Sequence, residues 1–174
     1  MIFKILTCVI IIAGMAASCT KSNLDVNIKD KEVNQVIENF NMFESNSGIK
    51  KWNMTAETAQ FVENEKYVLL INYTVKFFNE KKQGVVRSVL TALKGRLDTK
   101  TNDFYTIGET TVTNFGNEIL WCRDLCYVSK KERIFTDSKI RIERKDSLLT
   151  GTGLEATPDF ESIIIKQNRI EVNK

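Results

Sequence analysis

Histidine is absent from the 174-residue chain, and proline occurs once, at Pro158. Without histidine, the usual general base of enzymes and the commonest metal ligand are missing. The many serine and threonine hydroxyls therefore have no histidine to activate them as nucleophiles. An excess of one charge is also lacking, because 25 basic residues face 22 acidic ones, which does not favour nucleic acid as a partner. These absences predict a binding protein that is not an enzyme and needs neither a cofactor nor a metal.

Cysteine is scarce, with four positions in the chain. Cys8 and Cys19 belong to the N-terminal segment, which leaves Cys122 and Cys126 for the folded part. Four residues along a strand separate two Cα atoms by about 13 Å, beyond the roughly 7 Å reach of a disulfide. A zinc site would need two further ligands. We predict two semi-buried thiols, and a disulfide that closes a loop is the alternative.

Residues 1–18 have the composition of a signal peptide. Lys4 supplies the positive charge, and the apolar run that follows is too short to span a membrane comfortably. Small residues then lead directly into Cys19, as in a bacterial lipoprotein signal. This resemblance implies cleavage before Cys19 and acylation of Cys19 as a lipid anchor. The alternative is an uncleaved signal anchor, because Ala16 replaces the commoner leucine of that motif.

Residues 19–47 are polar and are predicted to be the lipidated N-terminus and a tether. Within the tether, Val33, Val36, Ile37 and Phe40 keep helical spacing, which is compatible with a short helix over Val33–Phe40, although a weakly ordered lead-in is the favoured interpretation. Residues 48–174 are long enough for one domain with its own core.

An eight-residue pattern recurs four times, with copies that begin at Met54, Leu90, Leu120 and Leu149. The copies start 36, 30 and 29 residues apart, within the range of repeat architectures. Apolar or small residues follow one another in steps of two, three and two. Steps of two keep side chains on one face of a strand, and the step of three inserts one extra residue, as a β-bulge does. Each copy is therefore predicted to be a bent strand, although chance likeness within an ordinary meander is the alternative.

A plainly alternating strand follows each of the first three copies, around Val75, Val112 and Ile142. The predicted fold class is all-β: a single twisted, open β-jelly roll of repeated bent antiparallel strands, behind a lipoprotein signal and a short tether. Folding over the apolar face leaves an interior slot that suits acyl chains, although ordinary core packing is the alternative for every inward residue. The predicted lipid-binding groove comprises Phe77, Leu90, Ala92, Ile107, Val112, Leu125, Ile140 and Ile142.

The last predicted strand, around Ile163 to Ile170, has no further unit to pair with. Its backbone donors and acceptors would face water or another protein. We therefore predict a partner-docking edge at Ile163, Ile164 and Ile165, where a second protein can add its own strands.

Several segments together resemble the LptC family, the membrane-anchored periplasmic component of the lipopolysaccharide export system. They are Trp52–Ala56, Leu90–Ala92, Gly116–Tyr127, Ile134–Thr136 with Ile140 and Ile142, and Thr150–Ala156 with its Gly-x-Gly-Leu sequence. The resemblance covers the domain from about Gly48 to Asn168. It implies a jelly roll that receives lipopolysaccharide or a related glycolipid from an inner-membrane ABC transporter and passes it to a soluble bridge protein of the LptA type.

Two features depart from the family pattern. Well-known members use a transmembrane helix where this chain has Cys19, and Cys122 stands where a threonine is common. The expected location is the periplasmic side of the inner membrane, with a lipid anchor. The alternative function is a β-sheet lipoprotein that binds a partner protein or a glycan and transports no lipid.

Overall fold

The computed structural model describes residues 33–62, 66–82 and 84–172, with side chains described as far as Gln167. The signal peptide and the anchor at Cys19 lie outside the described residues and stay predictions. Strands make up nearly all of the described chain. They are β1 (Val33–Asn46), β2 (Ile49–Val62), β3 (Tyr67–Phe78), β4 (Val86–Asp98), β5 (Phe104–Asn114), β6 (Ile119–Arg123), β7 (Cys126–Val128), β8 (Arg133–Arg144), β9 (Ser147–Ala156) and β10 (Ile163–Val172). A single 3-10 turn, η2 (Ser129–Lys131), precedes β8.

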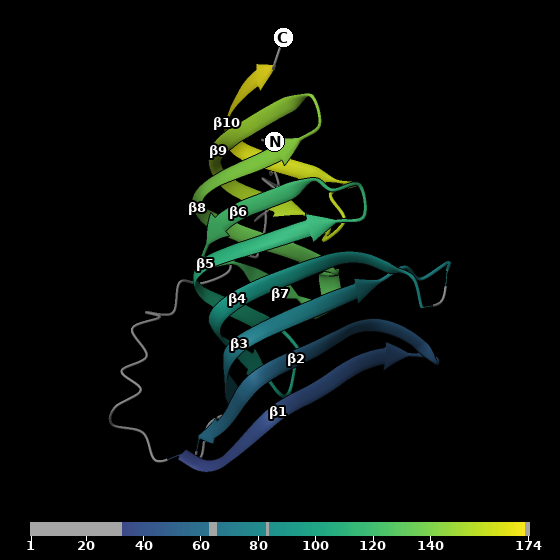
Figure 1. Cartoon of the computed structure of the whole chain (residues 1–174), viewed down its shortest axis with the longest axis vertical. Helices are drawn as coiled ribbons and strands as arrows, with labels where there is room; N and C mark the ends of the chain where they lie inside the picture. Colours follow the sequence, from purple (N-terminus) through teal and green to yellow (C-terminus); the bar gives the residue numbers. More distant parts are fainter. Residues whose placement is uncertain (1–32, 63–65, 83, 173–174) are drawn as a thin grey trace, which may run out of the picture.

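All ten strands belong to one sheet whose paired strands are antiparallel. The order is β1-β2-β3-β4-β5-β6-β8-β9-β10, and β7 pairs with β5 and β8 as the continuation of β6. Figure 1 shows the strands stacked along the long axis of the molecule, with β1 at one end and β10 at the other. The described sheet therefore has two edge strands, β1 and β10.

The strands bend where the sequence places the extra residue. At the bends, left-handed backbone occurs at Asn39 in β1, Asn72 in β3, Gly108 in β5, Gly153 in β9 and Asp124 between β6 and β7. In β4 and β8 the pairing shifts register instead, between Ala92 and Lys94 and between Thr136 and Lys139. Asparagine, aspartate and glycine are the residues that adopt left-handed backbone most readily. Successive bends lie side by side, so the whole sheet folds over along one line.

The buried positions follow the predicted steps of two, three and two. In the second and third copies all four positions are buried: Leu90, Ala92, Gly95 and Leu97, then Leu120, Cys122, Leu125 and Tyr127. In the fourth copy Leu154 and Ala156 are buried, and Leu149 and Gly151 are half-buried. The predicted all-β jelly roll of bent antiparallel strands is confirmed.

The interpretations of Val33–Phe40 as a weakly ordered lead-in or a short helix are both wrong, because these residues form the first half of β1. Asn39 has φ of 54°, so the strand bends there and Ile37 and Phe40, three residues apart, both become half-buried. This step of three produced the helix-like spacing. β1 pairs with β2 over its length, so the sheet includes residues that the sequence analysis assigned to the tether.

The two glycines of β9 have separate structural roles. Gly153 has φ of 77°, which the bend requires and which other residues rarely adopt. A Cβ at Gly151 would lie against the Gln167 carbonyl of β10 and 2.6 Å from Cγ2 of Ile165. Gly153 therefore allows the bend of β9, and Gly151 allows the close approach of the β9 and β10 backbones.

Replacing Gly151 with alanine should therefore push β10 away from β9. We expect Gly151→Ala to lower the free energy of unfolding by about 1–3 kcal/mol, the usual cost of overpacking. Gly116→Ala is the control, because its Cβ would lie 3.3 Å from Asn114 Oδ1 in an exposed hairpin turn. Urea unfolding followed by tryptophan fluorescence measures both, and equal stability of the two variants would contradict the close approach.

Candidate lipid-binding interior

The inner face of the folded sheet forms one apolar core. Seven of the eight predicted groove residues belong to the cluster of buried core residues: Phe77, Leu90, Ala92, Val112, Leu125, Ile140 and Ile142. Ile107 is half-buried and lies outside this cluster, because it pairs with the exposed Lys94 of β4 and directly precedes the bend of β5 at Gly108. The structure thus brings seven of the residues together on one face, and their contact with lipid stays a prediction.

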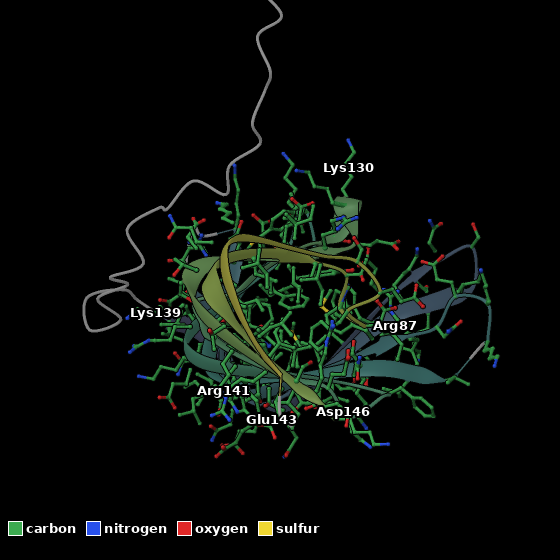
Figure 2. All side chains as sticks on the ribbon, turned by 90° about the horizontal axis from the view of Figure 1, so that it is seen from above. Arg87, Lys130, Lys139, Arg141, Glu143 and Asp146 are labelled. Atoms are coloured by element: carbon green, nitrogen blue, oxygen red, sulfur yellow. The ribbon has the colours of Figure 1, made fainter. Side chains whose placement is uncertain are left out.

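Side chains fill the space between the two walls of the roll. Trp52, Phe77, Phe104 and Tyr127 are fully buried and pack ring against ring, with centroids 4.8 Å apart for Phe104 and Tyr127 and 6.0 Å apart for Trp52 and Phe104. Figure 2, which looks down the long axis, shows side chains filling the ring of ribbon. Phe77 is a predicted groove residue and Tyr127 ends the third copy of the pattern, whereas Trp52 and Phe104 were not predicted to face inward. In this state the interior is a packed core.

Buried threonines hold the bend between β6 and β7. The Thr106 hydroxyl oxygen accepts hydrogen bonds from the Leu125 N–H and the Thr110 hydroxyl, each 2.7 Å long. The Gly108 N–H donates a further hydrogen bond to the Asp124 carboxylate, 2.8 Å long. These bonds satisfy polar groups that the bend would otherwise leave unpaired inside an apolar core.

The two walls are fastened together along the side of the roll opposite the bends. Three contacts between described side chains cross this line, and together we call them the seam: Glu44 with Ser129, Lys51 with Glu132, and Arg87 with Asp159. Glu44, Lys51 and Arg87 lie near strand ends in one row of turns, whereas their partners lie in the turns before β8 and β10. The partners are 85, 81 and 72 residues apart, so no local pattern in the sequence could reveal them.

Lys51 is the most highly connected cation of the seam. Its ammonium group contacts both Glu132 and Glu80. Burial acts to lower the pKa of Lys51, but the hydrogen bonds and charges of the two carboxylates outweigh it, so the pKa lies above its usual value. The same ammonium group holds the pKa of Glu80 below its usual value. Lys51 therefore stays charged at neutral pH, and this end of the seam remains closed by ion pairs.

Comparison with known families decides which proteins share this architecture. The chain matches, over residues 2–169, the family described as "Lipopolysaccharide-assembly, LptC-related". The chain belongs to the LptC-related family. No protein with curated annotation matches it. The resemblance found in the sequence is confirmed, and membership makes this LptC-related chain a lipopolysaccharide transport component associated with the cell envelope.

A concave surface on the outer face of the LptC-related sheet was not predicted from the sequence. This outer trough has a volume of about 850 Å³ and crosses β3, β4, β5, β6 and β8. Its floor is a row of residues that face one another across successive strands: Thr74, Thr91, Thr111, Trp121 and Arg141. These residues alternate with the inward set, so the two-residue period that located the core also locates the trough.

The trough combines hydroxyl groups, an aromatic ring and cations. The guanidinium group of Arg141 lies 5.2 Å from the Trp121 ring centroid, a cation–π arrangement. Arg123 and Lys139 also line the trough, and Glu109 adds a carboxylate. Figure 2 shows Lys139 and Arg141 pointing away from the interior. Such groups can bind a polar ligand, whereas the interior is lined mainly by apolar side chains.

Cys122 and Cys126 form no disulfide and are both buried. Burial, with a smaller contribution from the Asp124 carboxylate, raises the pKa of Cys122 to about 12. Cys122 is therefore a protonated, unreactive thiol at neutral pH. The prediction of two buried thiols is confirmed in preference to a disulfide.

The predicted docking edge lies on β10, which pairs with β9 and has no second partner among the described strands. Ile163 and Ile165 pack partly against the core, and Ile164 is 57% exposed. Phe160, in the turn before β10, is a buried core residue.

Residues 33–62, 66–82 and 84–172 contain no cluster of three potential metal ligands and no helix long and apolar enough to cross a membrane.

Proposed function

We propose that this LptC-related chain is a membrane-anchored periplasmic carrier of lipopolysaccharide or a related glycolipid. It accepts the lipid from an inner-membrane ABC transporter and passes it to a bridge protein of the LptA type. Cys19 is the proposed lipid anchor. The chain itself performs no chemistry, and the transporter supplies the energy.

One observation carries this proposal beyond family membership. The inner face is apolar along the stack from Met42 on β1 to Ile165 on β10, and both end strands have a free edge. A partner that adds a strand at either edge would extend the sheet and its apolar face together. Because an acyl chain in water costs about 0.8 kcal/mol per CH₂, a continuous apolar path is the physical requirement for moving one.

The packed interior sets a condition on loading. Acyl chains can replace the contacts between the walls only if the walls separate, and the seam is where the walls are held together by polar contacts. The seam contacts are only partly buried, so water can take the place of the lost partners when the walls separate. We therefore propose that lipid enters along the seam and that the bend line acts as the hinge.

A photo-crosslinking residue at Ile142 should capture glycolipid in cells, because Ile142 is fully buried on the inner face. The matched control is Arg141, the next residue, which is exposed and points outward. Analysis of crosslinked products by lipid staining distinguishes the two positions. Capture at Arg141 instead of Ile142 would place the glycolipid in the outer trough and favour the alternative function of glycan binding without lipid transport.

Closing the seam covalently should block loading. Cysteines introduced by Arg87→Cys and Asp159→Cys, joined with a short bis-maleimide, should abolish glycolipid capture at Ile142, because the walls can no longer separate. Each single variant treated with the same reagent is the control and should retain capture. Undiminished capture by the crosslinked protein would mean that lipid enters elsewhere, through an open end of the roll.

Shortening β10 should impair transfer without impairing the core. A chain that ends at Ile165 keeps Phe160, Ile163 and Ile165 on the core but loses most of the edge strand. We expect capture by the bridge protein to weaken about tenfold or more, equivalent to 1.4 kcal/mol of lost interface. Val36→Asp on the opposite edge strand, β1, is the control. An unchanged pull-down by the shortened chain would exclude residues 166–172 from the docking edge and leave Ile163–Ile165 as its remaining candidate part.

A further inference from the structure

Two buried polar groups in the apolar interior lack a hydrogen-bond partner. They are the indole nitrogen Nε1 of Trp52 and the hydroxyl Oγ of Ser88, on residues that are 0% and 1% exposed. The other such atoms in the described part of the chain are Nε atoms of arginines whose guanidinium groups already contact a carboxylate or an aromatic ring. A buried donor without a partner is uncommon and costly, so these two need an explanation.

The two groups lie on the same inner-face row. Trp52 on β2 faces Phe77 on β3, and Phe77 faces Ser88 on β4. Their strands are two spacings apart, which corresponds to about 10 Å. The neighbouring polar residues of the interior, Thr106 and Thr110, have their bonds satisfied. The unsatisfied groups are therefore confined to one row, beside the aromatic cluster.

The chemistry of the row selects its ligand. An indole N–H can only donate, and a serine hydroxyl can donate, so both can serve an acceptor. A charged acceptor would lose its hydration among Phe77, Phe104 and Leu90, at a large cost. A neutral acceptor attached to apolar chains avoids this cost. The carbonyl oxygens of ester or amide linkages, where acyl chains join a lipid, meet both conditions.

The row also lies directly beneath the seam. Arg87 precedes Ser88, and Asn114 faces Ser88 across the strand pair. Both hold Asp159: the Arg87 guanidinium forms an ion pair with its carboxylate at 3.3 Å, and the Asn114 amide donates to its carbonyl at 2.9 Å. Phe160 follows, buried and with φ of 64°, a conformation that a bulky residue adopts only under strain. The turn over the row is thus held to the other wall by the contacts of Asp159 and is strained at Phe160. Breaking those contacts would let the strain relax, which favours movement of this turn when the seam opens.

We propose that Trp52 and Ser88 form a carbonyl-binding site that receives the acyl linkages of the transported lipid once the seam opens. This site rests on the proposed function and identifies what part of the lipid the interior recognises. In the empty protein the two donors are unsatisfied, and the bound lipid satisfies them. The site thereby favours the loaded state and fixes how deeply the acyl chains enter.

Two matched probes test the site on the full chain. One is a short-chain fluorescent lipid with two ester linkages, which stays monomeric in buffer, and the other is its diether analogue with the same chains. Wild-type protein should bind the diester more tightly than the diether, by about fivefold for each hydrogen bond made. A net hydrogen-bond contribution of about 1 kcal/mol corresponds to this ratio.

Ser88→Ala and Trp52→Phe should each reduce that preference without weakening binding of the diether. Ser88→Ala should also unfold at the same temperature as the wild type or a higher one, because it removes an unsatisfied group. Ser138→Ala, on the outer face, is the control and should keep the preference. Equal binding of both probes by the wild type, or an unchanged preference in both variants, overturns the site alone. Binding of neither probe overturns the lipid-carrying function as well.

Discussion

One extra residue in the two-residue period of each strand is the constraint on which the rest of the structure depends. Because the insertions line up across the sheet, most of its strands bend at the same level and the sheet folds over its own apolar face. The core, the seam opposite the bends and the outer trough all follow from this fold. A flat sheet of the same composition would leave its apolar face in water.

Sequence patterns predicted most of this architecture, since both the alternation and the step of three are local. They located the four bent strands and seven of the inward residues, and burial at Leu90, Leu97 and Leu120 agrees. The same step of three misled at Val33–Phe40, where a bend at Asn39 imitates helical spacing. The contact between Lys51 and Glu132 could not be predicted, because it depends on how two distant turns meet after folding.

The packed interior bears on the proposed function, because side chains from both walls fill the space that the proposal assigns to lipid. Trp52, Phe77, Phe104 and Tyr127 contact one another across the two walls, so no apolar cavity has to stay open to water. Under the proposed function, the same side chains would give way to acyl chains, which offer equivalent apolar contacts. Loading would then exchange one set of apolar contacts for another, and the polar groups at the seam and at Ser88 would contribute to its balance.

The alignment of the bends has a consequence for how such proteins vary in size. Each bend is set by its own strand and needs only the neighbouring strand for pairing, so a hairpin can be gained or lost without changing the angle between the walls. Every added hairpin lengthens the roll by about 10 Å, two strand spacings. The distance over which a lipid can be shielded is therefore a matter of copy number, which duplication of a short gene segment can adjust.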